Sequence, residues 1–164
     1  MPIQLIVTDG LINPDRQQSA FSQLTGLLLS LHGLTGNEFM TPAVIGEVAV
    51  TPAGKTFVAG EPEPIAVLEL TVPSFVLATP QLKAAWIEQG TDIIEMAAEG
   101  KLPRSRIFAN ISYAVDGGWG IAGTLAAGLL FVASRAAAPR RRPIPYRALP
   151  RNLVFLVRHG ESRA

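Results

Sequence analysis

Pro2 is the residue of this sequence whose type and position could do chemistry. If Met1 is removed, Pro2 becomes a free secondary amine at the head of a predicted β-strand over residues 3–7. An α-amino group has an ordinary pKa near neutrality, and an apolar pocket lowers that pKa further by disfavouring the charged form. Such an amine can act as a general base. The alternative is that Pro2 only begins the strand, where its missing N–H costs nothing.

The chain up to residue 123 contains two copies of one pattern, residues 2–60 and residues 64–123. Each copy has an alternating apolar strand, a polar cap followed by proline, an apolar stripe at helical spacing, and a second strand with a short arm. The matching positions, 62 residues apart, are Pro2-Ile3 with Pro64-Ile65 and Phe57 with Trp119. The repeat indicates that both halves fold alike.

The pattern predicts where the elements lie. Helices are expected to begin at Asn13-Pro14 and Thr79-Pro80 and to end before Gly33 and Gly100. Strands are expected at 3–7, 47–51, 65–72 and 107–115, and short arms at 55–60 and 119–123. The predicted class is therefore α/β (α+β), with two pseudo-symmetric β-α-β repeats forming a four-stranded mixed sheet and two helices on one face.

Several motifs, taken in order, resemble the tautomerase superfamily over residues 2–123. They are the Met-Pro start, the duplication, His32-Gly33-Leu34-Thr35-Gly36 after the first helix, and Trp119-Gly120-Ile121-Ala122-Gly123 at the end. The Gly-Leu-Thr-Gly segment, with Pro52-Ala53-Gly54, is similar to the cis-3-chloroacrylic acid dehalogenase group, whose members are two-repeat chains that form trimers. The ending is similar to that of 4-oxalocrotonate tautomerase. The resemblance implies a tautomerase-type fold, a homotrimer, and Pro2 as a base that moves a proton between carbon and oxygen of an enol or 2-oxo acid.

The resemblance also implies pocket residues around Pro2. His32 could donate a hydrogen bond to a substrate oxygen, although it stands one residue closer to the Gly-Leu-Thr-Gly segment than the dehalogenase histidine; alternatively it interacts with the last helical carbonyls. Trp119 stands where 4-oxalocrotonate tautomerase has a phenylalanine that walls the pocket, and its alternative role is core packing. Asn110 and Tyr113 could each donate to an oxyanion or form a cross-strand or surface polar pair.

The arginines that bind carboxylate in the family are absent. Leu11 and Phe108 stand at two of their positions, and residues 72–79 contain no basic residue. These absences argue against hydrolytic dehalogenation and against tight binding of a dicarboxylate. Arg106 is the remaining candidate for a substrate carboxylate, reached through a neighbouring subunit's pocket; the alternative is a solvated charge.

Composition limits the other function classes. The 164 residues include no cysteine, so disulfides, thiolate zinc sites and thiol catalysis are excluded. No secretory signal opens the sequence, so a cytoplasmic protein is expected, with a small carboxylate or keto/enol substrate and no cofactor or metal. The competing class is a non-catalytic trimeric relative that binds or supports structure, and a promiscuous hydratase or dehalogenase is a further alternative.

Residues 124–164 form a basic tail rich in proline and arginine, which is not expected to be an independent domain. Up to Gly123 the sequence has six basic and twelve acidic residues, a net charge of −6, whereas the remainder carries +7. Residues 152–162 resemble the first strand and Arg-His-Gly motif of the histidine phosphatase superfamily, but too few residues remain for that fold, which favours a truncated fusion, a misread gene end or an appended peptide. A membrane span over 117–134 and non-specific nucleic-acid binding are weaker alternatives, and neither partner is expected.

Overall fold

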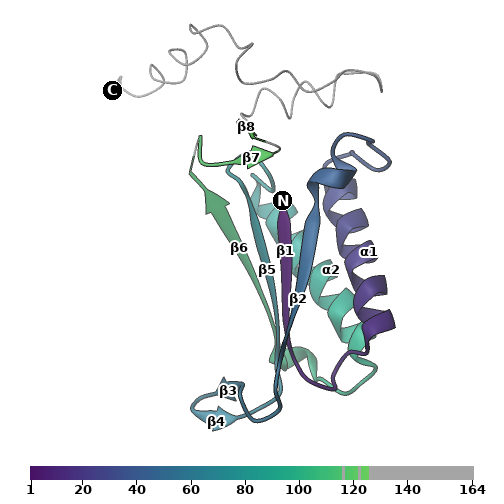
Figure 1. Cartoon of the computed structure of the whole chain (residues 1–164), viewed down its shortest axis with the longest axis vertical. Coiled ribbons are helices and arrows are strands. Elements are labelled where there is room, and N and C mark those ends of the chain that lie inside the picture. The colour runs from purple at the N-terminus through teal and green to yellow at the C-terminus, as the bar shows by residue number, and fades with distance from the viewer. Residues whose placement is uncertain (116, 122, 126–164) are drawn as a thin grey trace, which may run out of the picture.

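The structure, a computed structural model, describes residues 1–115, 117–121 and 123–125 of the chain. Its centre is a four-stranded sheet in the order β2-β1-β5-β6, and Figure 1 shows both helices on the same side of this sheet. The elements of the first repeat are β1 (Pro2–Thr8), α1 (Pro14–Leu31), a 3₁₀ turn (Thr41–Ala43), β2 (Ile45–Thr51), β3 (Phe57–Val58) and β4 (Glu61–Pro62). Those of the second are β5 (Ala66–Pro73), α2 (Pro80–Ala98), a 3₁₀ turn (Arg104–Arg106), β6 (Ile107–Ala114), β7 (Gly120–Ile121) and β8 (Thr124–Leu125). The predicted fold class is confirmed.

Both helices begin at the predicted caps. The Asn13 side chain accepts a hydrogen bond from the Arg16 N–H at 3.0 Å, and the Thr79 side chain accepts one from the Leu82 N–H at 3.3 Å. Each cap satisfies a backbone donor that has no partner within the helix, and the proline that follows has no such donor. Gly33, with φ of +65°, follows the end of α1 and donates to the Ser30 carbonyl at 3.0 Å, as the helix-stop signal predicted.

The register of strand pairing determines which residues lie at the same end of the sheet. Strand β1 is parallel to β2, where Pro2 pairs with Ile45, and antiparallel to β5, where Ile3 pairs with Leu70. Strand β6 is parallel to β5, where Val72 pairs with Tyr113. The start of β1 therefore lies beside the ends of β5 and β6. Figure 1 shows the N-terminus at this end, with the β7–β8 hairpin, and the β3–β4 hairpin at the opposite end.

One face of the sheet packs against the helices. Alternate residues of β1 and β5 are fully buried on this face, together with Trp86 and Ile94 of α2. Side chains on one face of a strand recur at every second residue, so Pro2, Gln4 and Ile6 lie on the opposite face, which no helix covers. Burial of apolar side chains on the helical face is the main stabilising contribution to the domain.

The end of the sheet away from Pro2 is closed by a buried hydroxyl network. The Thr8 and Thr56 hydroxyls lie 2.9 Å apart, and the Thr56 hydroxyl donates to the Glu63 carbonyl at 2.6 Å. The Thr8 hydroxyl oxygen also accepts from the Ile65 N–H at 3.0 Å. Because each buried polar group has a partner, the β3–β4 hairpin is fixed against the start of the second repeat.

Element boundaries differ from the predictions by a few residues. Strand β2 begins at Ile45 because its parallel pairing with β1 extends to Pro2, and the arm predicted at 55–60 is the β3–β4 hairpin, with β4 ending at Pro62. The arm predicted at 119–123 forms the β7–β8 hairpin. The tail was predicted to begin at residue 124, but Thr124–Leu125 form β8 and pair with β7; the rest of the predicted tail lies outside the described residues.

No helix in the described part of the chain is long and apolar enough to cross a membrane. Most of the span considered at 117–134 falls outside that part.

Candidate active site at the N-terminal end of the sheet

Met1 is held in the structure at the end where Pro2 begins β1. Its amino group donates to the Ala43 carbonyl oxygen, and its own carbonyl oxygen accepts from the Ile45 N–H at 3.1 Å. The Met1 side chain is buried in the hydrophobic core, with 5% of the residue exposed. The residue that must leave to free the Pro2 amine thus occupies an enclosed space next to it.

This space lowers the basicity of an amine. Burial lowers the pKa of the Met1 amino group from 8.0 to about 6, because the charged form loses hydration there. The folded chain therefore binds fewer protons than the unfolded chain between pH 6 and pH 8. The free energy of unfolding accordingly rises with pH through this window.

The pH dependence can be tested on the chain that carries Met1. Its free energy of unfolding is expected to fall as the pH is lowered from 8 to 6, with a slope of up to about 1.4 kcal/mol per pH unit, the limit for one proton. Urea unfolding at pH 6, 7 and 8 measures the slope. An N-terminally acetylated chain, which cannot titrate at this position, is the control and should lack this slope. Equal slopes in the two chains would contradict the assignment.

Two of the predicted catalytic residues, His32 and Tyr113, bind the backbone of the same residue, Leu77. The Leu77 N–H donates to His32 Nε2 at 3.3 Å, and the Tyr113 hydroxyl donates to the Leu77 carbonyl at 3.1 Å. Leu77 is fully buried and has φ of +50°, a backbone conformation that a leucine rarely adopts. Such strain persists only where surrounding contacts over-determine it, and His32 and Tyr113 are such contacts.

These bonds define what the two side chains can do in this arrangement. His32 Nε2 is an acceptor, so a hydrogen bond donated to a substrate would have to come from Nδ1. The Tyr113 hydroxyl already gives its proton to Leu77. The roles of both residues toward a substrate stay predictions, and their visible role is to position the segment between β5 and α2.

Sequence reasoning missed a cation beside this cluster. The ammonium of Lys83, in the first turns of α2, lies 5.3 Å from the centre of the Tyr113 ring, a cation–π distance. Lys83 forms no ion pair with any described residue. The available signal was its position after the Thr79-Pro80 cap, which places it at the same end of the sheet as Pro2.

Asn110 lies on the other face of the sheet from Tyr113. Its amide donates to a Glu69 carboxylate oxygen at 2.8 Å, and the Gln4 amide donates to Glu47 on the far side. The register places these four residues in one row across all four strands. Asn110 therefore shares the uncovered face with Pro2 and is one of a cross-strand polar pair.

Trp119 follows β6 and precedes β7. It is half-buried and packs against the hydrophobic core, and the strand β7 that it precedes lies at the end of the sheet that holds the N-terminus (Figure 1). The core contact is the alternative weighed from the sequence, and a wall of the pocket beside Pro2 stays a prediction.

Arg106 lies at the opposite end of the sheet from Pro2. It precedes β6, whose first residue pairs with the start of β5, and its guanidinium lies 3.5 Å from the Glu63 carboxylate. Strand β1 separates the two ends by about 20 Å at a rise of about 3.3 Å per residue. Within one chain Arg106 cannot reach a substrate at Pro2.

The other described arginines are also paired. Arg104 contacts Asp92 at 2.5 Å and Glu95 at 2.9 Å, and these hydrogen bonds raise its pKa. Arg16 pairs with Glu99. All three pairs are exposed, so each contributes little to stability.

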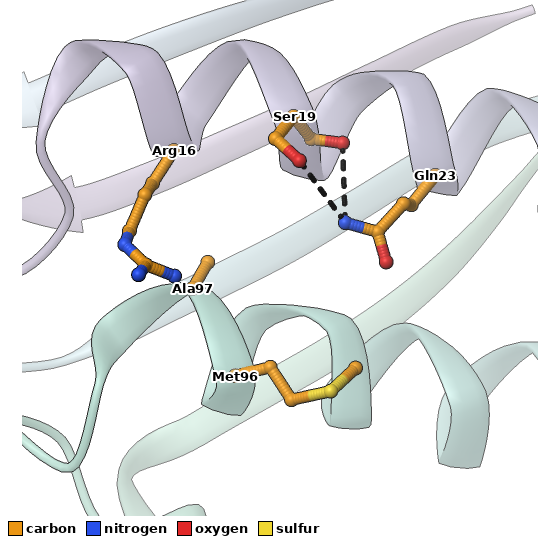
Figure 2. Close-up of a pocket in the computed structure, with 5 residues that line it drawn as sticks. All are labelled: Arg16, Ser19, Gln23, Met96 and Ala97. Carbon is orange, nitrogen blue, oxygen red and sulfur yellow. Dashed lines mark hydrogen bonds between the residues drawn. The ribbon is translucent and has the colours of Figure 1, made fainter.

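A shallow hollow of about 230 Å³ lies between the two helices, away from Pro2. Figure 2 shows Arg16, Ser19 and Gln23 on α1 facing Met96 and Ala97 on α2, with the Gln23 amide directed to Ser19 at 3.3 and 3.4 Å. Its polar groups bond to one another or to neighbouring side chains and do not converge on one point. None of the predicted site residues lines it.

No group of three or more histidine, cysteine or acidic side chains that could hold a metal ion occurs among the described residues.

Comparison with solved structures shows what this arrangement is similar to. A symmetric trimer of a wild-type fused 4-OT, Q0, has a TM-score of 0.65 at 16% identity, over 77% of this chain and 96% of that chain. N1, a member of the cis-3-chloroacrylic acid dehalogenase family, has a TM-score of 0.65 at 20% identity, over 85% and 93% of the two chains. Pt0534, inactivated by 2-oxo-3-pentynoate, has a TM-score of 0.65 at 14% identity, over 79% and 98%.

No protein-family model matches the chain, and no curated protein matches it significantly. The resemblance of residues 152–162 to histidine phosphatases therefore has no support from these comparisons, and that segment lies outside the described residues. At 14–20% identity the likeness to the solved structures establishes the architecture. The chain has the tautomerase-type α+β fold.

Proposed function

We propose that this chain is a tautomerase-like isomerase of the tautomerase superfamily, acting in the cytoplasm without a cofactor. After removal of Met1, the Pro2 amine is the general base that interconverts the enol and keto forms of a small 2-oxo acid. It accepts the proton of the enol hydroxyl and returns a proton to the neighbouring carbon, so that no co-reactant is needed.

The observation that carries this proposal is the setting of the amine. Pro2 heads a strand in the tautomerase-type fold, and burial at this end of the sheet lowers the pKa of the amino group next to it to about 6. A base works best when its pKa is near the operating pH. The same burial would lower the pKa of a Pro2 amine freed at this end of the sheet, which favours its neutral, basic form.

The proposed assembly is a homotrimer. Several of the similar solved structures are described as trimers, and the sheet face that carries Pro2 is not covered by helices in this chain. A trimer would also give Arg106 a route to substrate, through a neighbouring subunit's pocket, since it lies at the far end of its own sheet.

Intact mass is the first test of the proposal. Loss of one methionine from the expressed chain is expected, because a retained Met1 leaves Pro2 as a non-basic amide. Conversion of phenylenolpyruvate and of 2-hydroxymuconate to their keto forms is then measured. Retained Met1 in the natural chain, or no conversion by the Met1-free chain, would leave the non-catalytic trimeric relative as the better reading.

Lys83 is proposed to supply the cation for the substrate carboxylate. Replacement Lys83→Met keeps the length of the side chain and removes its charge, and it is expected to raise KM about tenfold with a smaller change in kcat. Lys55→Met, in the loop at the opposite end of the sheet, is the matched control and should leave KM unchanged. An equal KM for Lys83→Met and the natural chain would exclude Lys83 from substrate binding.

A further inference from the structure

Met1 marks the space that a substrate must enter. Its carbonyl carbon is bonded to the Pro2 nitrogen, so any molecule that reaches the free Pro2 amine takes the place of the Met1 backbone. That backbone is fixed at two points, since its amino group donates to the Ala43 carbonyl oxygen and its carbonyl oxygen accepts from the Ile45 N–H at 3.1 Å. The buried Met1 side chain shows that the adjoining space is apolar.

Removal of Met1 takes away the partners of both of these backbone groups. The Ile45 N–H continues the parallel ladder between β1 and β2 one residue beyond Pro2. The Ala43 carbonyl belongs to a buried residue of the short 3₁₀ turn before β2. A donor or acceptor that loses its partner in a partly buried place costs stability unless another molecule replaces it.

We propose that in the Met1-free chain the Ile45 N–H and the Ala43 carbonyl form the polar ends of the substrate site. The Ile45 N–H donates to a carboxylate oxygen of the enol acid, and the Ala43 carbonyl accepts from its enol hydroxyl as the substrate binds, before that proton passes to the Pro2 amine. This inference rests on the proposed function, because the ligand is the 2-oxo or enol acid named there.

The spacing of Met1 supports this assignment. From the amino nitrogen through Cα and C to the carbonyl oxygen, Met1 presents a donor and an acceptor separated by two carbon atoms. An enol acid presents its hydroxyl and a carboxylate oxygen with the same two carbon atoms between them. A substrate lies somewhat further out than Met1, because it contacts the Pro2 nitrogen without a covalent bond.

The assignment also accounts for binding without the family's arginines. A backbone N–H held in a strand is a preorganised donor that needs no reorganisation when charge develops on an oxygen. Lys83, proposed above to bind the substrate carboxylate, adds positive charge from the helical side.

Hydrogen exchange at the Ile45 amide tests the inference. Three samples are compared: the chain with Met1 retained by inhibiting methionine aminopeptidase, the Met1-free chain, and the Met1-free chain with saturating phenylpyruvate. Protection at Ile45 is expected in the first, exchange at least about tenfold faster in the second, and restored protection in the third. The Leu5 amide, in the middle of β1, should be protected equally in all three.

Two outcomes separate this inference from the proposed function. No restored protection at Ile45, in a chain that converts enol to keto form, overturns the inference and leaves Pro2 catalysis standing. Restored protection in a chain without conversion supports the site and overturns the proposed activity.

An amide-to-ester replacement at Ile45 removes the donor directly and keeps the side chain. It is expected to lower kcat/KM at least about tenfold. The same replacement at Gly46, whose N–H points to the outer edge of β2, is the control and should change kcat/KM less than about twofold. An unchanged kcat/KM for the Ile45 ester overturns the assignment.

Discussion

Retention of Met1 is expected to abolish enol-to-keto conversion, with a loss in kcat/KM of at least about 1,000-fold relative to the Met1-free chain. General acid–base groups contribute about 100- to 10,000-fold, and Met1 both converts the Pro2 amine into an amide and fills the adjoining space. Initial rates with phenylenolpyruvate on the two forms, each verified by intact mass, give the ratio.

The variant Pro2→Ala separates the effect of the Pro2 base from the effect of Met1 filling the adjoining space. After removal of Met1 it presents a primary amine in place of the fixed proline ring, so a loss of about 10- to 100-fold is expected. Circular dichroism of the variant should match the natural chain, because Pro2 is the first residue of its strand and donates no ladder hydrogen bond. Equal rates for Pro2→Ala and the natural chain would remove Pro2 from the mechanism.

The largest expected effect on stability is that of Trp86→Ala. Trp86 is fully buried in α2 and is the largest side chain of the core, and removal of a buried tryptophan costs about 3–5 kcal/mol. Since domains are stable by about 5–15 kcal/mol, this is a large share of the total. Urea unfolding should show a lower midpoint with an unchanged slope.

Two further substitutions make the Trp86 result specific. The Trp86 Nε1 atom has no hydrogen-bond partner among the described residues, so Trp86→Phe removes an unpaired buried donor and should cost clearly less than Trp86→Ala. Ile87→Ala, at the neighbouring position with 41% of its surface exposed, should cost less than about 1 kcal/mol. A loss for Ile87→Ala as large as that for Trp86→Ala would contradict the burial argument.

The fold could be predicted from the sequence because its signals are local. Asn13-Pro14 and Thr79-Pro80 satisfy the first backbone donors of their helices without help from the rest of the chain. Alternation in the first strand defines its buried face, and the repeat of this pattern implies that the second half forms the same unit. The relation between the two halves then follows from sheet pairing.

The candidate site could be predicted only in part, because its contacts join distant segments. No local signal places a leucine at positive φ, so Leu77 and its bonds to His32 and Tyr113 could not be foreseen. Lys83 was missed because a lysine on a helix is most often a solvated charge. Arg106 directly precedes the last long strand, as expected, but its distance from Pro2 follows from the antiparallel pairing of β1 with β5, and its role toward a substrate stays a prediction.

The Thr8 and Thr56 hydroxyls, bonded to the backbone of Glu63 and Ile65, give the proline of the second repeat a structural setting. Pro64 stands in the second repeat where Pro2 stands in the first, but its nitrogen is an internal amide bonded to Glu63, whose carbonyl is already engaged by Thr56. Of the two equivalent prolines, only Pro2 can therefore become a free amine. The Pro2 end of the sheet carries the amine proposed as the base, whereas the Pro64 end joins the two repeats through these hydrogen bonds.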